Sequence, residues 1–176
     1  MKEINFSCCT EEELWHYVAG FLSLKNIDTV LVGGAVVSIY SNSIYQSGDL
    51  DMVTHYPMAI LEKELNKIGF LKEGRHFIHP ECHHIFIEFV PPPVAIGDDY
   101  NILPDEVKIN NKVIKILSPT DCIKDRLASY IHFQARECLE QAILVAKRHP
   151  FHKNAIREWC FKEKAREEYQ EFIESG

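Results

Sequence analysis

The sequence predicts an α/β (α+β) fold, a mixed sheet flanked by helices and followed by a helical extension. Short β-branched and apolar runs alternate with segments of helical periodicity up to residue 117, and helical periodicity prevails afterwards. A chain of 176 residues with 46% hydrophobic residues fills one core and is too short for two independent catalytic domains. We therefore expect a core over residues 1–117 and a helical extension over residues 118–176, packed together as one compact unit.

Composition narrows the class of protein. No stretch approaches the roughly 18 to 20 apolar residues of a membrane span, and the first residues lack the pattern of a signal peptide. The six cysteines show no C-x-x-C spacing, which is typical of buried free thiols in a reducing compartment. We expect a cytoplasmic protein with no membrane partner. The net charge of −7 argues against a protein that coats nucleic acid.

Positive charge is nevertheless concentrated between Lys147 and Arg166. Basic residues there outnumber the two acids Glu158 and Glu163. Two interpretations remain open: a solvated helix face, which we favour, and a local surface for an RNA acceptor.

The amino-terminal half begins with a helix and two strands. Thr10 followed by Glu11-Glu12-Glu13 is typical of a helix start, and the helix is expected to end near Lys25-Asn26. The run 29–32 predicts a strand that stops at Gly33-Gly34, and a buried helix follows over 35–40. Acidic and apolar residues then alternate over 49–54, which predicts a strand with Asp49 and Asp51 on one face.

Further elements follow in the same alternating pattern. Pro57 opens a helix that Gly69 closes, and strands are expected over 75–79 and 84–90. A hairpin over 107–116 turns at Asn110-Asn111. Ser118-Pro119 starts a long helix to about His149, Pro150 breaks it, and one last amphipathic helix follows, marked by Ile156, Trp159, Cys160, Tyr169 and Phe172.

Three acids are candidate metal ligands. Residues two apart on a strand share a face, with about 6.5 to 7 Å between their α-carbons, so Asp49 and Asp51 can converge on one cation or bridge two. Carboxylate oxygens favour Mg²⁺ or Mn²⁺. Glu88, the single acid in an apolar strand, is our candidate for a third ligand or a base that activates a hydroxyl. If Glu88 has neither role, its carboxylate must be ion-paired or lie on a solvent-exposed face of the sheet.

The Gly33-Gly34 turn is a candidate phosphate-binding element, because glycines let backbone N–H groups approach phosphate oxygens at the start of a helix. Ser47 adds a hydroxyl donor. Lys124 and Arg126 are candidates for neutralising the charge of a triphosphate. For these two we slightly favour surface ion pairs with Asp121 or Asp125.

A second cluster lies at His79-Pro80-Glu81-Cys82-His83-His84, with His76 nearby. Imidazole and thiolate are good Zn²⁺ ligands, but the spacing matches no standard zinc module. We favour a polar turn, and a histidine facing the carboxylate site is the other interpretation.

The order Leu31-Val32-Gly33-Gly34, helix, Asp49-Leu50-Asp51 resembles the nucleotidyltransferase superfamily of the DNA polymerase β type. Residues 117–128, with Arg136, also resemble the helical tail of small bacterial members such as the AbiEii-type toxin group. The likeness spans most of residues 29–146. It implies that Asp49, Asp51 and Glu88 hold divalent metal and that the glycine turn binds a nucleoside triphosphate.

Two functions remain open at this stage. The first is an enzyme that moves a nucleotidyl group from a nucleoside triphosphate to a hydroxyl of RNA, protein or a small molecule. The second is a domain of the same fold that has lost turnover and acts as a nucleotide sensor or as a partner in a toxin–antitoxin pair.

Overall fold

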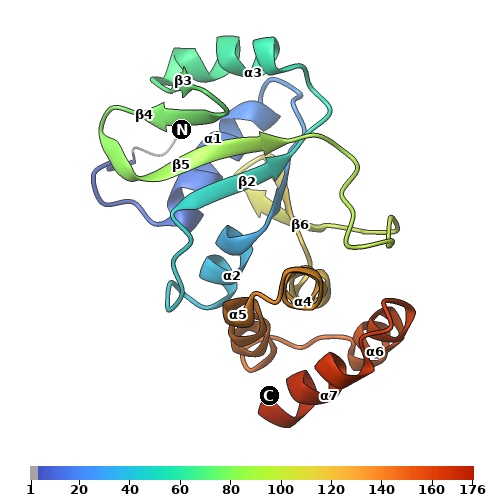
Figure 1. Cartoon of the computed structure of the whole chain (residues 1–176). Helices are drawn as coiled ribbons and strands as arrows, with labels where there is room; N and C mark the ends of the chain where they lie inside the picture. Colours follow the sequence, from blue (N-terminus) through green and yellow to red (C-terminus); the bar gives the residue numbers. More distant parts are fainter. Residues whose placement is uncertain (1–3) are drawn as a thin grey trace.

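A computed structural model describes residues 4–176. Its centre is a seven-stranded mixed sheet in the order β3-β4-β5-β2-β1-β7-β6 (Figure 1). The strands are β1 (Val30–Val32), β2 (Asp49–Val53), β3 (Leu71–Glu73), β4 (His76–His79), β5 (Cys82–Val90), β6 (Asp105–Ile109) and β7 (Lys112–Ile116). The mixed α/β architecture predicted from the sequence is therefore confirmed.

The register of the central strands aligns residues that are far apart in sequence. β1 pairs antiparallel with β2 and parallel with β7. β2 pairs parallel with β5, with Asp51 opposite Glu88 and Asp49 opposite Phe86. β5 in turn pairs antiparallel with β4, where His76 lies opposite Glu88. One row across three strands thus carries Asp51, Glu88 and His76.

Helices flank the sheet. They are α1 (Glu11–Ser23), α2 (Gly34–Tyr40), α3 (Met58–Leu65) with a short 3₁₀ turn η1 (Asn66–Ile68), α4 (Pro119–Phe133), α5 (Arg136–Ala146), α6 (Lys153–Lys162) and α7 (Arg166–Ser175). Figure 1 shows α3 at one end of the molecule and the carboxyl-terminal helices at the other. Among residues 4–176, no helix is long and apolar enough to cross a membrane.

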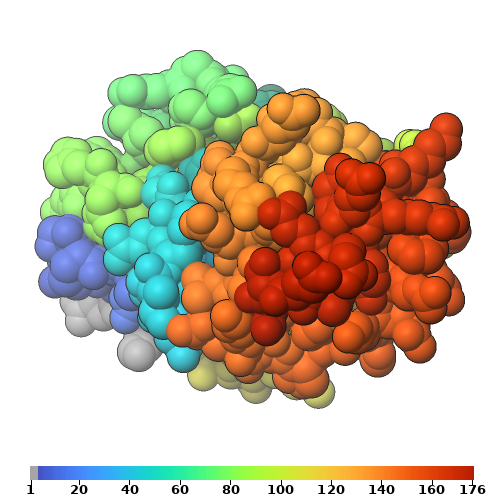
Figure 2. Space-filling model, turned by 60° about the horizontal axis from the view of Figure 1, so that its bottom comes forward, coloured from blue at the N-terminus to red at the C-terminus, as the bar shows by residue number. Residues whose placement is uncertain are grey.

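The carboxyl-terminal helices pack on the core around α2. His149 Nε2 lies 2.7 Å from the Tyr40 carbonyl oxygen at the end of α2, and the Tyr40 hydroxyl donates to the Leu117 carbonyl. Figure 2 shows the orange helical segments directly beside the cyan segment, and the red segments beyond them. The helical extension therefore covers the side of the core from which β2 begins.

The residues predicted to begin and end helices form the expected capping contacts. Thr10 forms a capping box with Glu13, each side chain bonding the other residue's backbone N–H. Ser118 Oγ accepts from the Asp121 N–H, and Pro119 occupies the first turn. Gly69 adopts the left-handed conformation, with φ 89°, after η1.

Two predicted helices are wrong in length, because each is broken in two. The helix expected to reach His149 stops at Phe133, where Gln134 turns left-handed with φ 54°, and α5 then begins. The last helix is interrupted at Lys164, with φ 61°, and the Ala165 N–H bonds back to the Cys160 carbonyl. Apolar periodicity continues on both sides of each break, so the pattern predicts one helix where the backbone makes two.

The sheet also exceeds the prediction at one edge. β3 is exposed at all three residues, so it lacks the apolar alternation by which strands are recognised. β5 starts at Cys82, two residues before the expected start, so Cys82 and His84 lie on the same strand as Glu88.

Candidate active site

Asp49 and Asp51 lie on β2 and alternate with the fully buried Leu50 and Met52. Because neighbouring strand residues point to opposite faces, both carboxylates leave the sheet on the same side. Each is half-buried. This face of β2 is the centre of the candidate site.

Glu88 lies beside Asp51 on β5, but its carboxylate also faces β4. Glu88 Oε2 is 3.3 Å from Arg75 Nε and 3.3 Å from His76 Nε2. The Glu88 side chain is 22% exposed, so it lies partly in solvent and also has two basic neighbours. The structure therefore brings Glu88 next to the aspartates and pairs it with basic groups on its other side.

The pKa of Asp51 reflects the negative charges around it. Burial, then the negative charges of Asp49 and Glu88, raise the pKa of Asp51 from 3.8 to about 6, while Arg126 opposes the shift. Carboxylates crowded in this way repel one another, and a divalent cation between them removes that repulsion. Carboxylate oxygens are the ligands that Mg²⁺ and Mn²⁺ prefer, so Asp49 and Asp51 suit the metal expected from the sequence, whereas Glu88 Oε2 faces Arg75 and His76.

The glycine turn abuts both aspartates. Gly33 has φ 74°, and a Cβ added there would lie 2.7 Å from Asp51 Oδ2. A Cβ on Gly34 would overlap the Ser47 hydroxyl, and that hydroxyl donates to Asp49 Oδ1. Only glycine leaves room for the Asp51 carboxylate and the Ser47 side chain, so Gly33, Gly34, Ser47 and the aspartates form one assembly.

Sequence reasoning missed Glu11, which supports this assembly. Glu11 is only 4% exposed, and its Oε1 accepts from the backbone N–H of Ser47, at 2.9 Å, and of Gly48, at 3.3 Å. Its Oε2 accepts from Ser38 Oγ of α2 at 3.0 Å. Glu11 therefore fixes the loop that leads into Asp49. In the sequence it is one of three first-turn acids, and only tertiary packing distinguishes it from Glu12 and Glu13.

Lys124 and Arg126 separate on α4. Residues two apart on a helix point about 200° apart around its axis, so they rarely share a site. Lys124 Nζ lies 3.2 Å from Asp121 Oδ1 and 3.3 Å from Asp99 Oδ2. It lines a cavity of about 270 Å³ between the 98–101 loop and α6.

Arg126 pairs with the acid next to it on α4. Its guanidinium bonds the Asp125 carboxylate at 2.5 Å and Gln141 Oε1 at 3.4 Å, and its positive charge lowers the pKa of Asp51. The ion pairs that we favoured, Lys124 with Asp121 and Arg126 with Asp125, are therefore present, although the four side chains are largely buried. Arg126 is the one of the two cations whose charge acts on Asp51.

The basic region contains one aromatic stack. The guanidinium carbons of Arg157 and Arg166 lie 5.1 and 4.8 Å from the centre of the Phe161 ring, which is cation–π geometry. Two of the basic side chains in Lys147–Arg166 thus pack against an aromatic ring of their own surface.

The histidines of the segment 76–84 do not form one site, because three of them have different neighbours. His76 Nε2 accepts from Arg75 Nε at 3.1 Å and lies 3.3 Å from Glu88 Oε2. His79 stacks on Phe6 with ring centres 3.7 Å apart. His84 Nδ1 lies 3.9 Å from Cys82 Sγ. The polar turn that we favoured is present at Pro80-Glu81, and His76 fulfils the other interpretation, a histidine that faces the carboxylate site.

Comparison of sequences finds no protein-family model that matches the chain and no similar curated protein. Comparison of structures does find similar folds. An antigenic nucleotidyltransferase-like protein from Paracoccidioides brasiliensis shows a TM-score of 0.60 at 19% identity, over 80% of this chain and 77% of that one.

The antibiotic-resistance factor ANT(2'')-Ia is also similar in fold. Its solution structure has a TM-score of 0.59 at 14% identity and covers 92% of this chain and 95% of that one. Its crystal structure with adenylyl-2''-tobramycin has a TM-score of 0.51 at 14% identity, over 92% and 96% of the two chains. The chain thus has a nucleotidyltransferase fold. The narrower resemblance to AbiEii-type toxins stays a prediction.

Proposed function

We propose that the chain is a metal-dependent nucleotidyltransferase, which moves a nucleotidyl group from a nucleoside triphosphate to a hydroxyl acceptor. One observation carries the proposal: Asp49, Asp51 and Glu88 share one region of the sheet beside the Gly33-Gly34 turn. The raised pKa of Asp51 supports it, because groups with perturbed pKa values gather at functional sites.

The position of each side chain in the site suggests its role in the transfer. Asp49 and Asp51 would hold Mg²⁺ or Mn²⁺, which supplies Lewis-acid polarisation of the phosphate and neutralises charge on the leaving pyrophosphate. Ser47 fixes Asp49 through its hydroxyl, and the backbone at Gly33 lies open next to Asp51 for a phosphate oxygen. Arg126 places a permanent positive charge near Asp51, where negative charge develops during transfer.

Glu88 is suited to take the proton of the acceptor hydroxyl. His76 and Arg75 hold its carboxylate at 3.3 Å each, so it is oriented before an acceptor arrives. The proton leaves the hydroxyl oxygen for Glu88 as that oxygen attacks the α-phosphate, and pyrophosphate departs with the electrons of the broken P–O bond.

We propose a small molecule as the acceptor. The likeness to ANT(2'')-Ia spans 92% of this chain, so it includes the helical extension as well as the sheet. An RNA end, which the basic region Lys147–Arg166 would contact, is the competing acceptor. Within that region the Arg157 and Arg166 side chains already pack on Phe161.

The test is pyrophosphate release with Mg²⁺, labelled nucleoside triphosphates and two acceptor panels, amino-sugar antibiotics and short RNAs. Wild type is expected to release pyrophosphate with the first panel, and Asp51→Asn to lose this activity. Asp28→Asn is the matched control, because the Asp28 side chain is 64% exposed and forms an ion pair with Lys115 at 3.4 Å. Tight nucleotide binding by wild type without turnover on either panel would favour the inactive sensor or toxin–antitoxin partner instead.

A further inference from the structure

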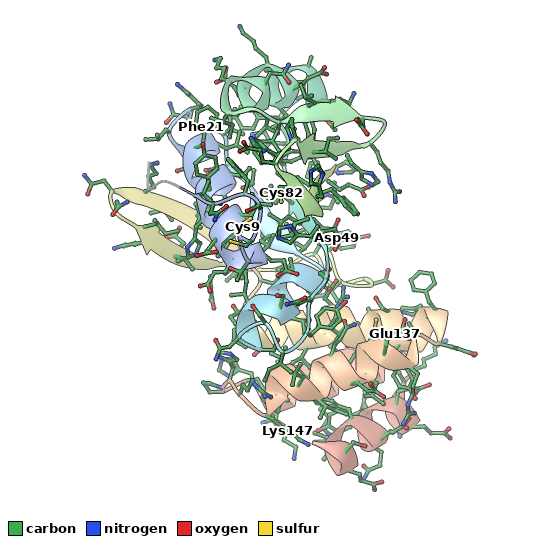
Figure 3. All side chains as sticks on the ribbon, turned by 90° about the vertical axis from the view of Figure 1, so that its left-hand side faces the viewer. Cys9, Phe21, Asp49, Cys82, Glu137 and Lys147 are labelled. Carbon is green, nitrogen blue, oxygen red and sulfur yellow. The ribbon has the colours of Figure 1, made fainter. Side chains whose placement is uncertain are left out.

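Cys9, Cys82 and His84 converge outside the carboxylate site. Cys9 Sγ lies 4.0 Å from Cys82 Sγ, and Cys82 Sγ lies 3.9 Å from His84 Nδ1. All three atoms are within 4.8 Å of one another. Figure 3 shows Cys9 and Cys82 next to each other. We propose that this group, the Cys9–Cys82–His84 triad, binds Zn²⁺.

The size of the triad matches the ion. Zn–S bonds of about 2.3 Å and Zn–N bonds of about 2.0 Å at tetrahedral angles separate ligand atoms by about 3.5 to 3.8 Å. The Cys9–Cys82 and Cys82–His84 separations exceed these values by only a few tenths of an ångström, and the Cys9–His84 separation is within 4.8 Å. Small rotations of the side chains therefore complete three of the four tetrahedral positions, and water takes the fourth because His84 is exposed.

The tautomer of His84 suits a metal ligand. His84 Nε2 lies 2.8 Å from the Cys9 carbonyl oxygen, which only accepts, so Nε2 carries the proton and donates it. Nδ1 of the neutral ring is then left with a lone pair, and it is Nδ1 that points toward Cys82 Sγ. A backbone carbonyl that holds the second nitrogen is the usual support of a metal-binding histidine.

The chemistry of the triad separates it from the carboxylate site. Two sulfurs and an imidazole prefer Zn²⁺, whereas the carboxylates of Asp49, Asp51 and Glu88 prefer Mg²⁺ or Mn²⁺. Without metal, each thiol has a carbonyl partner, Phe6 for Cys9 at 3.7 Å and Ile85 for Cys82 at 3.6 Å. Zn²⁺ replaces both thiol protons, which pass to solvent as the two Zn–S bonds form.

A metal bound by the triad would link two separate elements of the fold. Cys9 precedes α1, and Cys82 and His84 are on β5. A Cβ on Gly48 would lie 3.6 Å from the His84 carbonyl oxygen, and the Phe86 N–H bonds the Gly48 carbonyl at 3.2 Å. Zn²⁺ would thus tie the start of α1 to the strand that supports the loop before Asp49.

Cobalt substitution in the full chain is the direct test. The reduced protein is stripped with a chelator and titrated with Co²⁺ and then Zn²⁺. We expect thiolate-to-cobalt charge-transfer bands that saturate at one equivalent, disappear on addition of Zn²⁺, and persist in Asp51→Asn, which lacks a carboxylate of the other site. Absence of these bands in the wild type overturns the proposal without any variant.

Matched variants assign the ligands. Cys82→Ser and His84→Ala are expected to weaken Zn²⁺ binding by about tenfold or more, and the melting temperature should lose its rise with Zn²⁺. Cys8→Ser and His83→Ala, which change exposed neighbours outside the triad, should behave as wild type. Equal loss of affinity in both sets contradicts the assignment. A mass lower by two hydrogens in freshly isolated protein, localised to Cys9 and Cys82, would instead show a disulfide and overturn it.

Discussion

Asp51 and Glu88 are register partners on the parallel strands β2 and β5, although 36 residues separate them in the sequence, from 51 to 88. The pairing places their side chains on one face of the sheet, and the negative charge of Glu88 raises the pKa of Asp51. This neighbouring pair of acids is the basis of the proposed chemistry and of the first prediction.

Replacement of Asp51 should separate stability from activity. The folded pKa of about 6 lies above the ordinary 3.8, so the native state favours the protonated form. Ionisation therefore costs the metal-free protein nothing below pH 3.8, progressively more between pH 3.8 and 6, and the full amount above pH 6. We expect Asp51→Asn to stabilise the metal-free protein at pH 8 by up to about 3 kcal/mol while abolishing transfer.

Denaturant unfolding at pH 8 and pH 4 measures this effect. The gain of Asp51→Asn over wild type should shrink at pH 4, where wild-type Asp51 is protonated. A gain that is the same at both pH values would show that the Asp51 charge is not its source. Asp28→Asn, at an exposed position, is the control.

Glu11 should act as a positioning residue. Glu11→Ala leaves the Ser47 and Gly48 N–H groups without their acceptor, which costs about 1–3 kcal/mol and loosens the loop before Asp49. Glu11→Gln keeps one acceptor oxygen for both groups, and its NH₂ donates to Ser38 Oγ, so it should restore most of the stability and kcat. Equal kcat losses for both variants would contradict the hydrogen-bond account. Glu12→Gln changes an exposed neighbour and serves as control.

Gly33→Ala should lose stability through its backbone conformation and should also lose activity through a clash with Asp51. At φ 74° any side chain is strained, and the added Cβ would also meet Asp51 Oδ2 at 2.7 Å. The matched variant is Gly74→Ala, since Gly74 has φ 61° and no atom within 4 Å of such a Cβ. Gly74→Ala should lose about 1 kcal/mol of stability from the backbone. Gly33→Ala should lose about 1–3 kcal/mol, because φ 74° with ψ −153° is a region that essentially only glycine occupies. Only Gly33→Ala should also lose metal affinity and activity. Comparable activity in the two variants would exclude a role for the Gly33–Asp51 contact.

The Arg126→Ala and Lys124→Ala variants should differ in kcat/KM for the nucleotide. Arg126→Ala removes the positive charge that acts on Asp51, and we expect kcat/KM for the nucleotide to fall by about 10²-fold. Lys124→Ala removes the partner of Asp99 and Asp121 and should lower stability more than kcat/KM. If Lys124→Ala lowered kcat/KM as much as Arg126→Ala, the assignment of Lys124 to the other cavity would be wrong.

The sequence by itself determined the sheet region and most of the proposed site. Alternation along β2 places Asp49 and Asp51 on one face, and the turn at Gly33-Gly34 follows from the end of an apolar run. These signals are local, since a two-residue period and a glycine with positive φ depend on neighbouring residues. The breaks at Gln134 and Lys164 escaped prediction because the apolar periodicity runs through them.

Only the tertiary structure decided which distant groups meet. Strand pairing joined Glu88 to Asp51 and His76, and burial selected Glu11 from three adjacent acids. The direction of each side chain around α4 separated Arg126 from Lys124. The Cys9–Cys82–His84 triad joins two segments 73 residues apart, from Cys9 to Cys82. Such contacts depend on register and packing, which the spacing of residues along the chain does not specify.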